Sequence, residues 1–257
     1  MITTKTRTRI EALDFELDDL GPSEIHDLVD STCESGGPPK IILAMNPEKL
    51  SLIERNQALA ALYRSADAIL PDGVGVRLAA RLLAHKTVRR LTGADLMLYL
   101  VAYAARKGYS IAMIGSDEAT NQTAADALRA KFPSLQIAFR QHGYFGEEDV
   151  EGLLSSLAKV RPHITFIGLG SPRQELFVQR YRERMQTNVV QCVGGTFDCI
   201  AGKVTRAPVL FQEAGCEWLY RLMRQPSRVV RYGRLVKFSF RVAREFLKLQ
   251  PAPGHRI

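Results

Sequence analysis

One aspartate stands at a position that suits proton transfer. Asp72 follows a short apolar run, within the sequence Leu-Pro-Asp-Gly-Val-Gly, and a predicted helix begins shortly after it. A carboxylate at the end of a buried strand, held in a tight turn, can accept a proton from a substrate hydroxyl. Pro-Asp-Gly is also an ordinary turn, and an aspartate there can simply cap a helix. The spacing alone therefore leaves a general base and a turn residue both open.

Glycine-containing turns elsewhere in the chain could hold a phosphate or a sugar. Gly115 and Ser116 follow an apolar run and precede a predicted helix, where free backbone N–H groups suit a phosphate. The segment lacks both G-x-G-x-x-G and a Walker lysine, so a turn that simply needs glycine is an equally good explanation. Gln174, in Gly-Ser-Pro-Arg-Gln-Glu, can exchange hydrogen bonds with sugar hydroxyls or uracil. A helix start with solvated charges is the alternative there.

Two more residues complete the candidate set. Asp198 ends the glycine-rich sequence Gly-Gly-Thr-Phe-Asp, and Tyr144 in His-Gly-Tyr-Phe could present its ring to a base or sugar. No D-x-D motif follows a predicted strand, and the acidic run 147–149 is typical of a helix start. We therefore expect no metal and no cofactor. The cysteines show no C-x-x-C pairing, which favours reduced and mostly buried thiols at Cys33, Cys192, Cys199 and Cys216.

Short apolar runs alternate with longer amphipathic segments along most of the chain. This alternation predicts an α/β fold with a mostly parallel sheet and helices on both faces. Ligands bind such sheets at the carboxyl ends of the strands, which is where the turns described above lie. We predict strands at 41–45, 68–70, 110–114, 136–139, 164–169 and 189–193, and helices at 50–65, 76–84, 94–107, 119–132, 147–159 and 174–185.

The chain divides by composition into an extension, a body and a basic appendage. Residues 1–39 look like an N-terminal extension or peripheral hairpin that ends in Gly-Gly-Pro-Pro, and 40–215 form the α/β body. The net charge is +8, and the nine Lys/Arg and single Glu between 218 and 250 account for all of it. The appendage, 216–257, therefore calls for an anionic partner.

The appendage contains a basic amphipathic helix. Such a helix suits the surface of an anionic membrane, since surface helices packed on a body usually mix charges of both signs. A surface helix packed on the body and a nucleic-acid-binding tail are the alternatives. The predicted apolar stripe is Leu235, Phe238, Val242, Phe246 and Leu249, and the opposite basic face is Arg234, Lys237, Arg241, Arg244 and Lys248.

Several ordered segments together resemble the WecG/TagA/CpsF glycosyltransferases, glycosyltransferase family 26. The resemblance extends over 40–232, and the segments are specific as a set because their order and spacing agree. They are Asn46–Glu48, Ala68–Gly75, Arg90–Asp95, His142–Phe145, Gly168–Glu175, Val193–Asp198, Gly202–Pro208 and Glu217–Leu222.

The resemblance implies a Rossmann-like fold of the GT-E type, with the body as its catalytic domain. It implies an inverting enzyme that needs no metal and moves a hexose-type sugar from a UDP-sugar to a sugar on undecaprenyl diphosphate, for cell-surface polysaccharide synthesis. It makes Asp72 the general base and places Asn46, Arg90, Gln174 and Asp198 in the substrate pocket.

The resemblance also implies that the appendage docks on the membrane, with Arg221, Arg228 and Arg231 at the acceptor diphosphate or the lipid surface. The family commonly has Thr two residues before Asn46, where this chain has Ala44 and so lacks a hydroxyl. No apolar run reaches the ~20 residues of a membrane span, and no signal-peptide core follows the basic N-terminus. We expect a cytoplasmic protein that is peripheral on the inner face of the cell membrane.

The expected partners are a UDP-sugar donor, a lipid-linked sugar acceptor and an anionic membrane surface. We expect no nucleic acid, and a homo-oligomer is left open. A second hypothesis is a non-catalytic, membrane-associated module that binds a nucleotide and needs no base. A nicotinamide-dependent oxidoreductase is a third, and the missing G-x-G-x-x-G argues against it.

Overall fold

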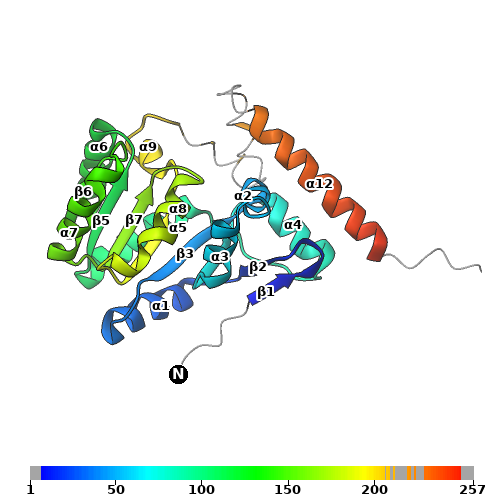
Figure 1. Ribbon diagram of the computed structural model, residues 1–257, viewed down its shortest axis with the longest axis horizontal. Coiled ribbons are helices and arrows are strands. Elements are labelled where there is room, and N and C mark those ends of the chain that lie inside the picture. The colour runs from blue at the N-terminus through cyan, green and yellow to red at the C-terminus, as the bar shows by residue number, and fades with distance from the viewer. Residues whose placement is uncertain are drawn as a thin grey trace, which may run out of the picture.

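A six-stranded sheet forms the centre of the computed structural model, which describes residues 7–205, 207–208, 211, 219–220, 223 and 229–249, without the side chains of 229–232. The strand order is β4-β3-β8-β7-β5-β6, and all neighbouring strands run parallel (Figure 1). The predicted α/β fold is therefore confirmed. The strands are β3 (Lys40–Met45), β4 (Ala68–Pro71), β5 (Ser110–Gly115), β6 (Gln136–Gln141), β7 (Ile164–Gly168) and β8 (Val189–Cys192).

The order of the strands explains where a ligand can enter. The chain first builds β3 and β4 on one side of the sheet and β5 and β6 on the other. It then returns through β7 and β8, which fill the gap between the two halves. Ligands of open parallel sheets bind outside the carboxyl ends of strands where the order reverses. The carboxyl ends of β3, β8 and β7 are thus the expected position of a site.

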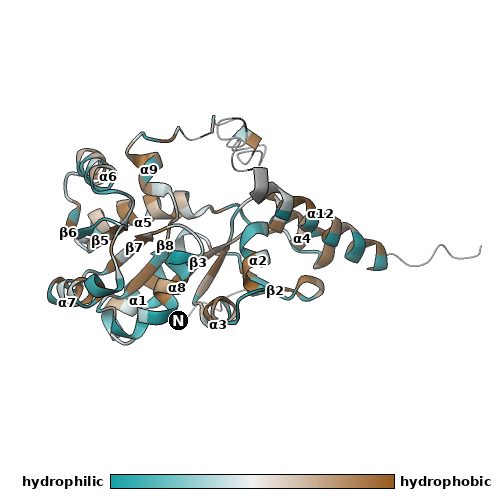
Figure 2. Ribbon diagram, turned by 45° about the horizontal axis from the view of Figure 1, so that its top comes forward, coloured by the Kyte–Doolittle hydropathy of each residue, from teal (hydrophilic) through white to brown (hydrophobic). Residues whose placement is uncertain are grey.

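Apolar side chains cover both faces of the sheet, which is why the strands are nearly continuous apolar runs. Alternate residues of one strand enter opposite cores: Ile41 and Leu43 face one, and Ile42 faces the other. Helices cover both faces, and Figure 2 shows hydrophobic colour along the central strands. They include α4 (Val74–Leu83), α5 (Gly93–Lys107), α6 (Glu118–Lys131), α7 (Val150–Val160), α8 (Arg173–Tyr181) and α9 (Thr196–Ile200).

One predicted helix is wrong, because 50–65 forms two helices. They are α2 (Pro47–Ile53) and α3 (Gln57–Ser65). The side chain of Asn56 accepts the backbone N–H groups of Ala58 and Leu59 at 3.0 and 3.1 Å, so it caps the start of α3. The predicted helix at 174–185 likewise ends early, at the end of α8, and a 3₁₀ turn continues over 182–184.

Residues before the sheet pack into the same two cores. Strands β1 (Arg7–Ile10) and β2 (Phe15–Asp18) form an antiparallel hairpin, and α1 (Pro22–Ser35) follows. The buried Asp18 accepts the backbone N–H of Ile69 at 2.7 Å and so ties the hairpin to β4. The proposed boundary at residue 39 remains a prediction, and the buried side chains of the hairpin and α1 share the cores of the sheet.

The long C-terminal helix α12 (Val229–Leu249) lies along α4 and α2 (Figure 1). Phe238 and Val242 are buried, and a Cβ at Gly75 of α4 would lie 3.5 Å from Phe238 Cε1. The centre of the predicted membrane stripe therefore packs on the body, so the assignment of Phe238 and Val242 to lipid is wrong. Among the described residues, no helix combines the length and hydrophobicity that crossing a membrane requires.

Candidate active site

A cavity of about 530 Å³ opens at the carboxyl ends of β3, β4, β7 and β8. This volume lies within the range of small-molecule sites. The cavity also lies at the edge of the sheet where the strand order predicts a ligand. The cavity brings together five candidates that are far apart in the sequence, and Gly115, Ser116 and Tyr144 are not among its lining residues. The five are Asn46, Asp72, Arg90, Gln174 and Asp198.

Asp72 and Asn46 meet because their strands are neighbours. Met45 of β3 pairs in register with Pro71 of β4, so the residues after them lie side by side. The Oδ1 atom of Asn46 accepts the backbone N–H of Lys49 at 3.0 Å and caps α2. This leaves Nδ2 of Asn46 to donate to Oδ2 of Asp72 at 3.4 Å. The N-cap of α4 is Gly73, so Asp72 is not the cap of that helix.

Arg90 supplies a cation to the cavity wall. It lies in the loop between α4 and α5, where its Nη1 donates to Oδ2 of Asp95 at 3.3 Å. Thr92 caps α5 by accepting the backbone N–H of Asp95, and its hydroxyl donates to Asp95 Oδ2 at 2.8 Å. The cap of α5 therefore also orients the arginine that faces the cavity.

The amide of Gln174 is bound within the protein, and its contact with a sugar or uracil remains a prediction. The side chain is only 3% exposed. Its Oε1 accepts the backbone N–H of Gly194 at 2.9 Å, and its Nε2 donates to Oε1 of Glu175 at 3.0 Å. Glu175 in turn forms a buried ion pair with Lys49 of α2. The sequence analysis missed Lys49 and Glu175, because nothing in a linear pattern shows that these two residues meet.

In the turn after β5, the backbone at Gly115 packs closely on the backbone of Gly168 in β7. At Gly115, φ is +146°, and a Cβ there would lie 2.3 Å from the carbonyl oxygen of Gly168. Asp117 caps α6 by accepting the backbone N–H of Thr120, and the hydrogen bond from Lys203 holds the pKa of Asp117 well below its ordinary value. A carboxylate thus already occupies the helix start at which we predicted a phosphate, although that binding role itself remains untested.

Ser116 and Tyr144 stand apart from the cavity in different ways. The hydroxyl of Ser116 donates to Oδ1 of Asp198 at 3.3 Å, so it contacts a lining residue without lining the cavity itself. Tyr144 is 75% exposed, and its backbone N–H donates to Nδ1 of His142. Substrate binding by either residue remains a prediction.

The buried Cys192 lines the cavity as a neutral thiol. Burial raises the pKa of the Cys192 thiol well above its ordinary value, and the nearby carboxylate of Glu175 raises it further. The thiol is therefore protonated, and it is free and buried as predicted, whereas Cys33 and Cys199 are half-buried and Cys216 lies outside the described residues. The hydroxyl of Tyr63 donates to the carbonyl oxygen of Ala44, which lines the cavity.

Within the described ranges, no group of three or more His, Cys, Asp or Glu side chains lies close enough together to hold a metal ion.

Four cations of α12 have acidic partners, contrary to the sequence interpretation. Arg234 pairs with Glu48 of α2 at 3.3 Å, and Arg241 forms an ion pair with Glu54 at the end of α2. Arg244 and Lys248 both contact Glu245. Arg221 and Arg228 lie outside the described residues, as does the side chain of Arg231.

Fold and site together define a class: an α/β protein of Rossmann-like architecture with a ligand-sized cavity at the carboxyl edge of its parallel sheet. The model of the glycosyl transferase WecG/TagA/CpsF family matches residues 10–252, and the chain belongs to this family. The resemblance seen in the sequence is thereby confirmed. The protein is a glycosyltransferase of cell-surface polysaccharide synthesis, and membership implies a sugar donor and a lipid-linked acceptor.

Proposed function

We propose that this enzyme transfers a hexose-type sugar from a UDP-sugar to a sugar carried on undecaprenyl diphosphate, with inversion and without a metal ion. The observation that carries the proposal is the pairing of Asp72 with Asn46 in the wall of the cavity. The acceptor hydroxyl would attack the anomeric carbon from the face opposite UDP. Its proton would pass to the Asp72 carboxylate as the bond between that carbon and UDP breaks.

Asn46 and Arg90 would assist this displacement from either side. The amide of Asn46 is fixed by its role as helix cap, so the hydrogen bond from its Nδ2 orients the Asp72 carboxylate. Arg90 would stabilise the negative charge that develops on the departing diphosphate. In the proposal, Arg221, Arg228 and Arg231 bind the diphosphate of the acceptor, which guanidinium groups can hold through paired hydrogen bonds.

A substitution at Asp72 tests the proposal directly. In an assay of donor sugars against a synthetic lipid-diphosphate-sugar acceptor, we expect Asp72→Asn to lower turnover by about 10² to 10⁴ while UDP still binds. Asp126→Asn, at an exposed carboxylate on α6, is the matched control and should keep wild-type turnover. Turnover near wild type in Asp72→Asn would exclude Asp72 as the base. Turnover that EDTA abolishes and Mg²⁺ restores would refute metal independence.

The proposal includes docking on an anionic membrane through the exposed face of α12. Val236, Phe240 and Leu247 point away from the buried Phe238, and Phe240 is 74% exposed. They recur at intervals of four and seven residues, so they form one apolar stripe. Leu235 of the same helix lines the cavity, so a docked α12 would bring the cavity close to an acceptor held in the bilayer.

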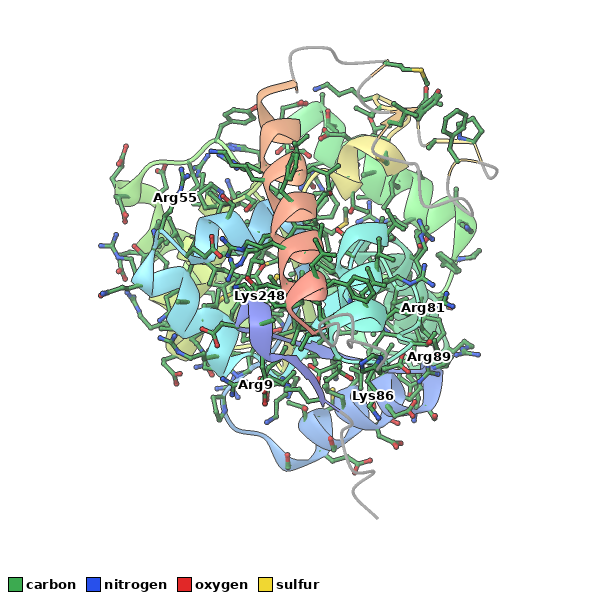
Figure 3. All side chains as sticks on the ribbon, turned by 90° about the vertical axis from the view of Figure 1, so that its right-hand side faces the viewer. Arg9, Arg55, Arg81, Lys86, Arg89 and Lys248 are labelled. Atoms are coloured by element: carbon green, nitrogen blue, oxygen red, sulfur yellow. The ribbon has the colours of Figure 1, made fainter. Side chains whose placement is uncertain are left out.

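Cations of the body surround α12 on the face shown in Figure 3. Arg55 lies on one side of the helix, and Arg81 and Lys86 lie on the other, whereas Arg9 and Arg89 pair with Asp14 and Asp19. Each Lys or Arg near an anionic surface contributes roughly 1 kcal/mol. The proposed membrane face therefore combines the apolar stripe with basic residues of the body, whereas Arg234 and Arg241 are engaged with α2.

Two phenylalanines on opposite faces of α12 separate membrane binding from stability. Phe240→Ser should weaken sedimentation with anionic vesicles by at least about tenfold, because burying one such side chain contributes about 1.5–3 kcal/mol. Its thermal stability should stay at the wild-type value. Phe238→Ser is the matched variant and should lower the melting temperature, because Phe238 is 6% exposed. Unchanged vesicle binding by Phe240→Ser would show that this face does not meet lipid.

A further inference from the structure

The ion pair between Lys49 and Glu175 is the most deeply buried charged group in the wall of the cavity and has no part in the displacement proposed above. Glu175 is 1% exposed and contacts both Lys49 Nζ and Gln174 Nε2. Its second oxygen, Oε2, is buried and has no hydrogen-bond partner among the described residues. Burying a polar atom without a partner is costly, and an apolar pair of similar size is often as stable as a buried ion pair. Fold stability alone therefore does not explain these charges.

The charge of Glu175 determines which way the amide of Gln174 points. A glutamine amide can turn over and exchange its oxygen and nitrogen, but an ionised carboxylate only accepts hydrogen bonds. Nε2 of Gln174 must therefore face Glu175, and Oε1 must face the backbone N–H of Gly194. With the amide reversed, two acceptors would meet at Glu175 and two donors would meet at Gly194.

Gly194 belongs to a part of the wall that needs such an anchor. It has a φ of +57° and is followed by Gly195, and both residues line the cavity. Two glycines in sequence have no side chains that could restrict the backbone. Lys49 comes from α2, whose N-cap is Asn46, so the network connects the helix beside Asp72 with the glycine turn after β8.

We propose that Glu175 and Lys49 are positioning residues: they fix the amide of Gln174, which holds the backbone of Gly194 and Gly195 in the geometry that the substrate requires. The expected effect on catalysis rests on the proposed sugar-transfer reaction. It assigns Gln174 a role in shaping the cavity wall through Gly194, distinct from direct recognition of sugar or uracil through both ends of its amide.

The test replaces the whole ion pair by apolar residues, so that no uncompensated charge is left. In Lys49→Met/Glu175→Leu the fold should persist, with a melting temperature near that of the wild type. Amide hydrogen exchange at Gly194, measured by NMR relative to Val193, should be about tenfold faster because the orientation of Gln174 is lost. Val193 is a suitable reference because its N–H donates to the backbone of Ile167. We expect kcat/KM for sugar transfer to fall about tenfold to a hundredfold.

If the double variant does not fold, the single variant Glu175→Gln provides the test. Glu175→Gln keeps an acceptor for Gln174, but a neutral amide is a weaker acceptor than a carboxylate. The rate of amide exchange at Gly194 should therefore rise by about threefold, which is less than in the double variant. The fall in kcat/KM should be smaller as well. Wild-type exchange at Gly194 in the folded variant would overturn the proposal, as would faster exchange with unchanged kcat/KM. Absence of transfer by the wild-type enzyme would instead refute the proposed function and leave the exchange result valid.

Discussion

At the amino-terminal end of the sheet, polar side chains bind one another, whereas at the carboxyl end they line a cavity. Asp30 accepts the hydroxyls of Tyr103 and Tyr109 at 2.7 and 3.1 Å. The ring of His163, which precedes β7, stacks on Tyr109 with centroids 4.7 Å apart. At the other end, Nδ2 of Asn46 donates to Oδ2 of Asp72 at 3.4 Å, and both residues line a cavity. Tyrosines, histidines and carboxylates therefore indicate chemistry only where neighbouring side chains leave room for a ligand.

The comparison predicts that substitutions at the carboxyl end reduce catalysis, and that those at the amino end reduce stability. Arg90 and its neighbour Arg89 offer the largest test. Arg90→Ala should lower kcat/KM by about 10² to 10³, because it removes a cation from the proposed site of the leaving diphosphate. Arg89 pairs with Asp19 away from the cavity, so Arg89→Ala should retain wild-type kcat/KM. Equal losses in the two variants would remove Arg90 from the proposed site.

A pair of glycines sharpens the comparison within the carboxyl end itself. Gly115→Ala should lower the free energy of unfolding by about 3 kcal/mol, because the new Cβ would collide with the backbone of Gly168. Gly73→Ala should cost about 1–2 kcal/mol, since its φ is +95° but nothing lies within 4 Å of the added atom. Urea unfolding of both variants measures the difference. A smaller loss at Gly115 than at Gly73 would contradict the close packing of β5 on β7.

The smallest effect is expected at the amino end, as a dependence of stability on pH. Burial lowers the pKa of His163, and its Nδ1 accepts the backbone N–H of Ser110 at 3.1 Å, a bond that protonation would break. As the pH falls below about 6.5, the unfolded chain binds a proton that the folded protein still excludes. The free energy of unfolding therefore falls with decreasing pH until the folded pKa is reached.

His163→Gln should flatten this part of the stability profile, below about pH 6.5. The exposed His85 provides the control, and His85→Asn should keep the wild-type slope. Urea unfolding at a series of pH values gives both slopes, and sugar transfer at pH 7 should be unchanged in either variant. An unchanged slope in His163→Gln would mean that other groups carry the acid sensitivity.

Local sequence patterns predicted the strands well and the ends of the helices less well. The ends of each predicted strand lie within two residues of the ends in the structure. Buried parallel strands are easy to locate because they are apolar runs bounded by glycine, proline or polar residues. The break between α2 and α3 was missed although Asn56 is a favourable N-cap. A cap that interrupts an otherwise continuous apolar pattern is difficult to distinguish from a polar residue on the surface of one longer helix.

Only some of the candidate residues that follow strands line the cavity. Asp72 follows the edge strand β4, Gln174 lies in the helix after β7, and both line the cavity. Gly115 ends β5, and a Cβ there would collide with the backbone of Gly168. The turns after β4 and β5 look similar in the sequence, since each contains glycine and leads into a helix. Tertiary packing, which local patterns do not specify, decides which turn lines the cavity.

The sequence by itself determined the α/β class, the positions of the strands, the basic amphipathic character of the tail and the family. All of these depend on residues that are close in the chain or on the order of motifs. The tertiary structure alone decided that Phe238 faces α4 while Phe240 stays exposed, and that Glu175 meets Lys49. The physical reason is that burial and charge pairing depend on partners more than a hundred residues away, which only the packed fold brings into contact.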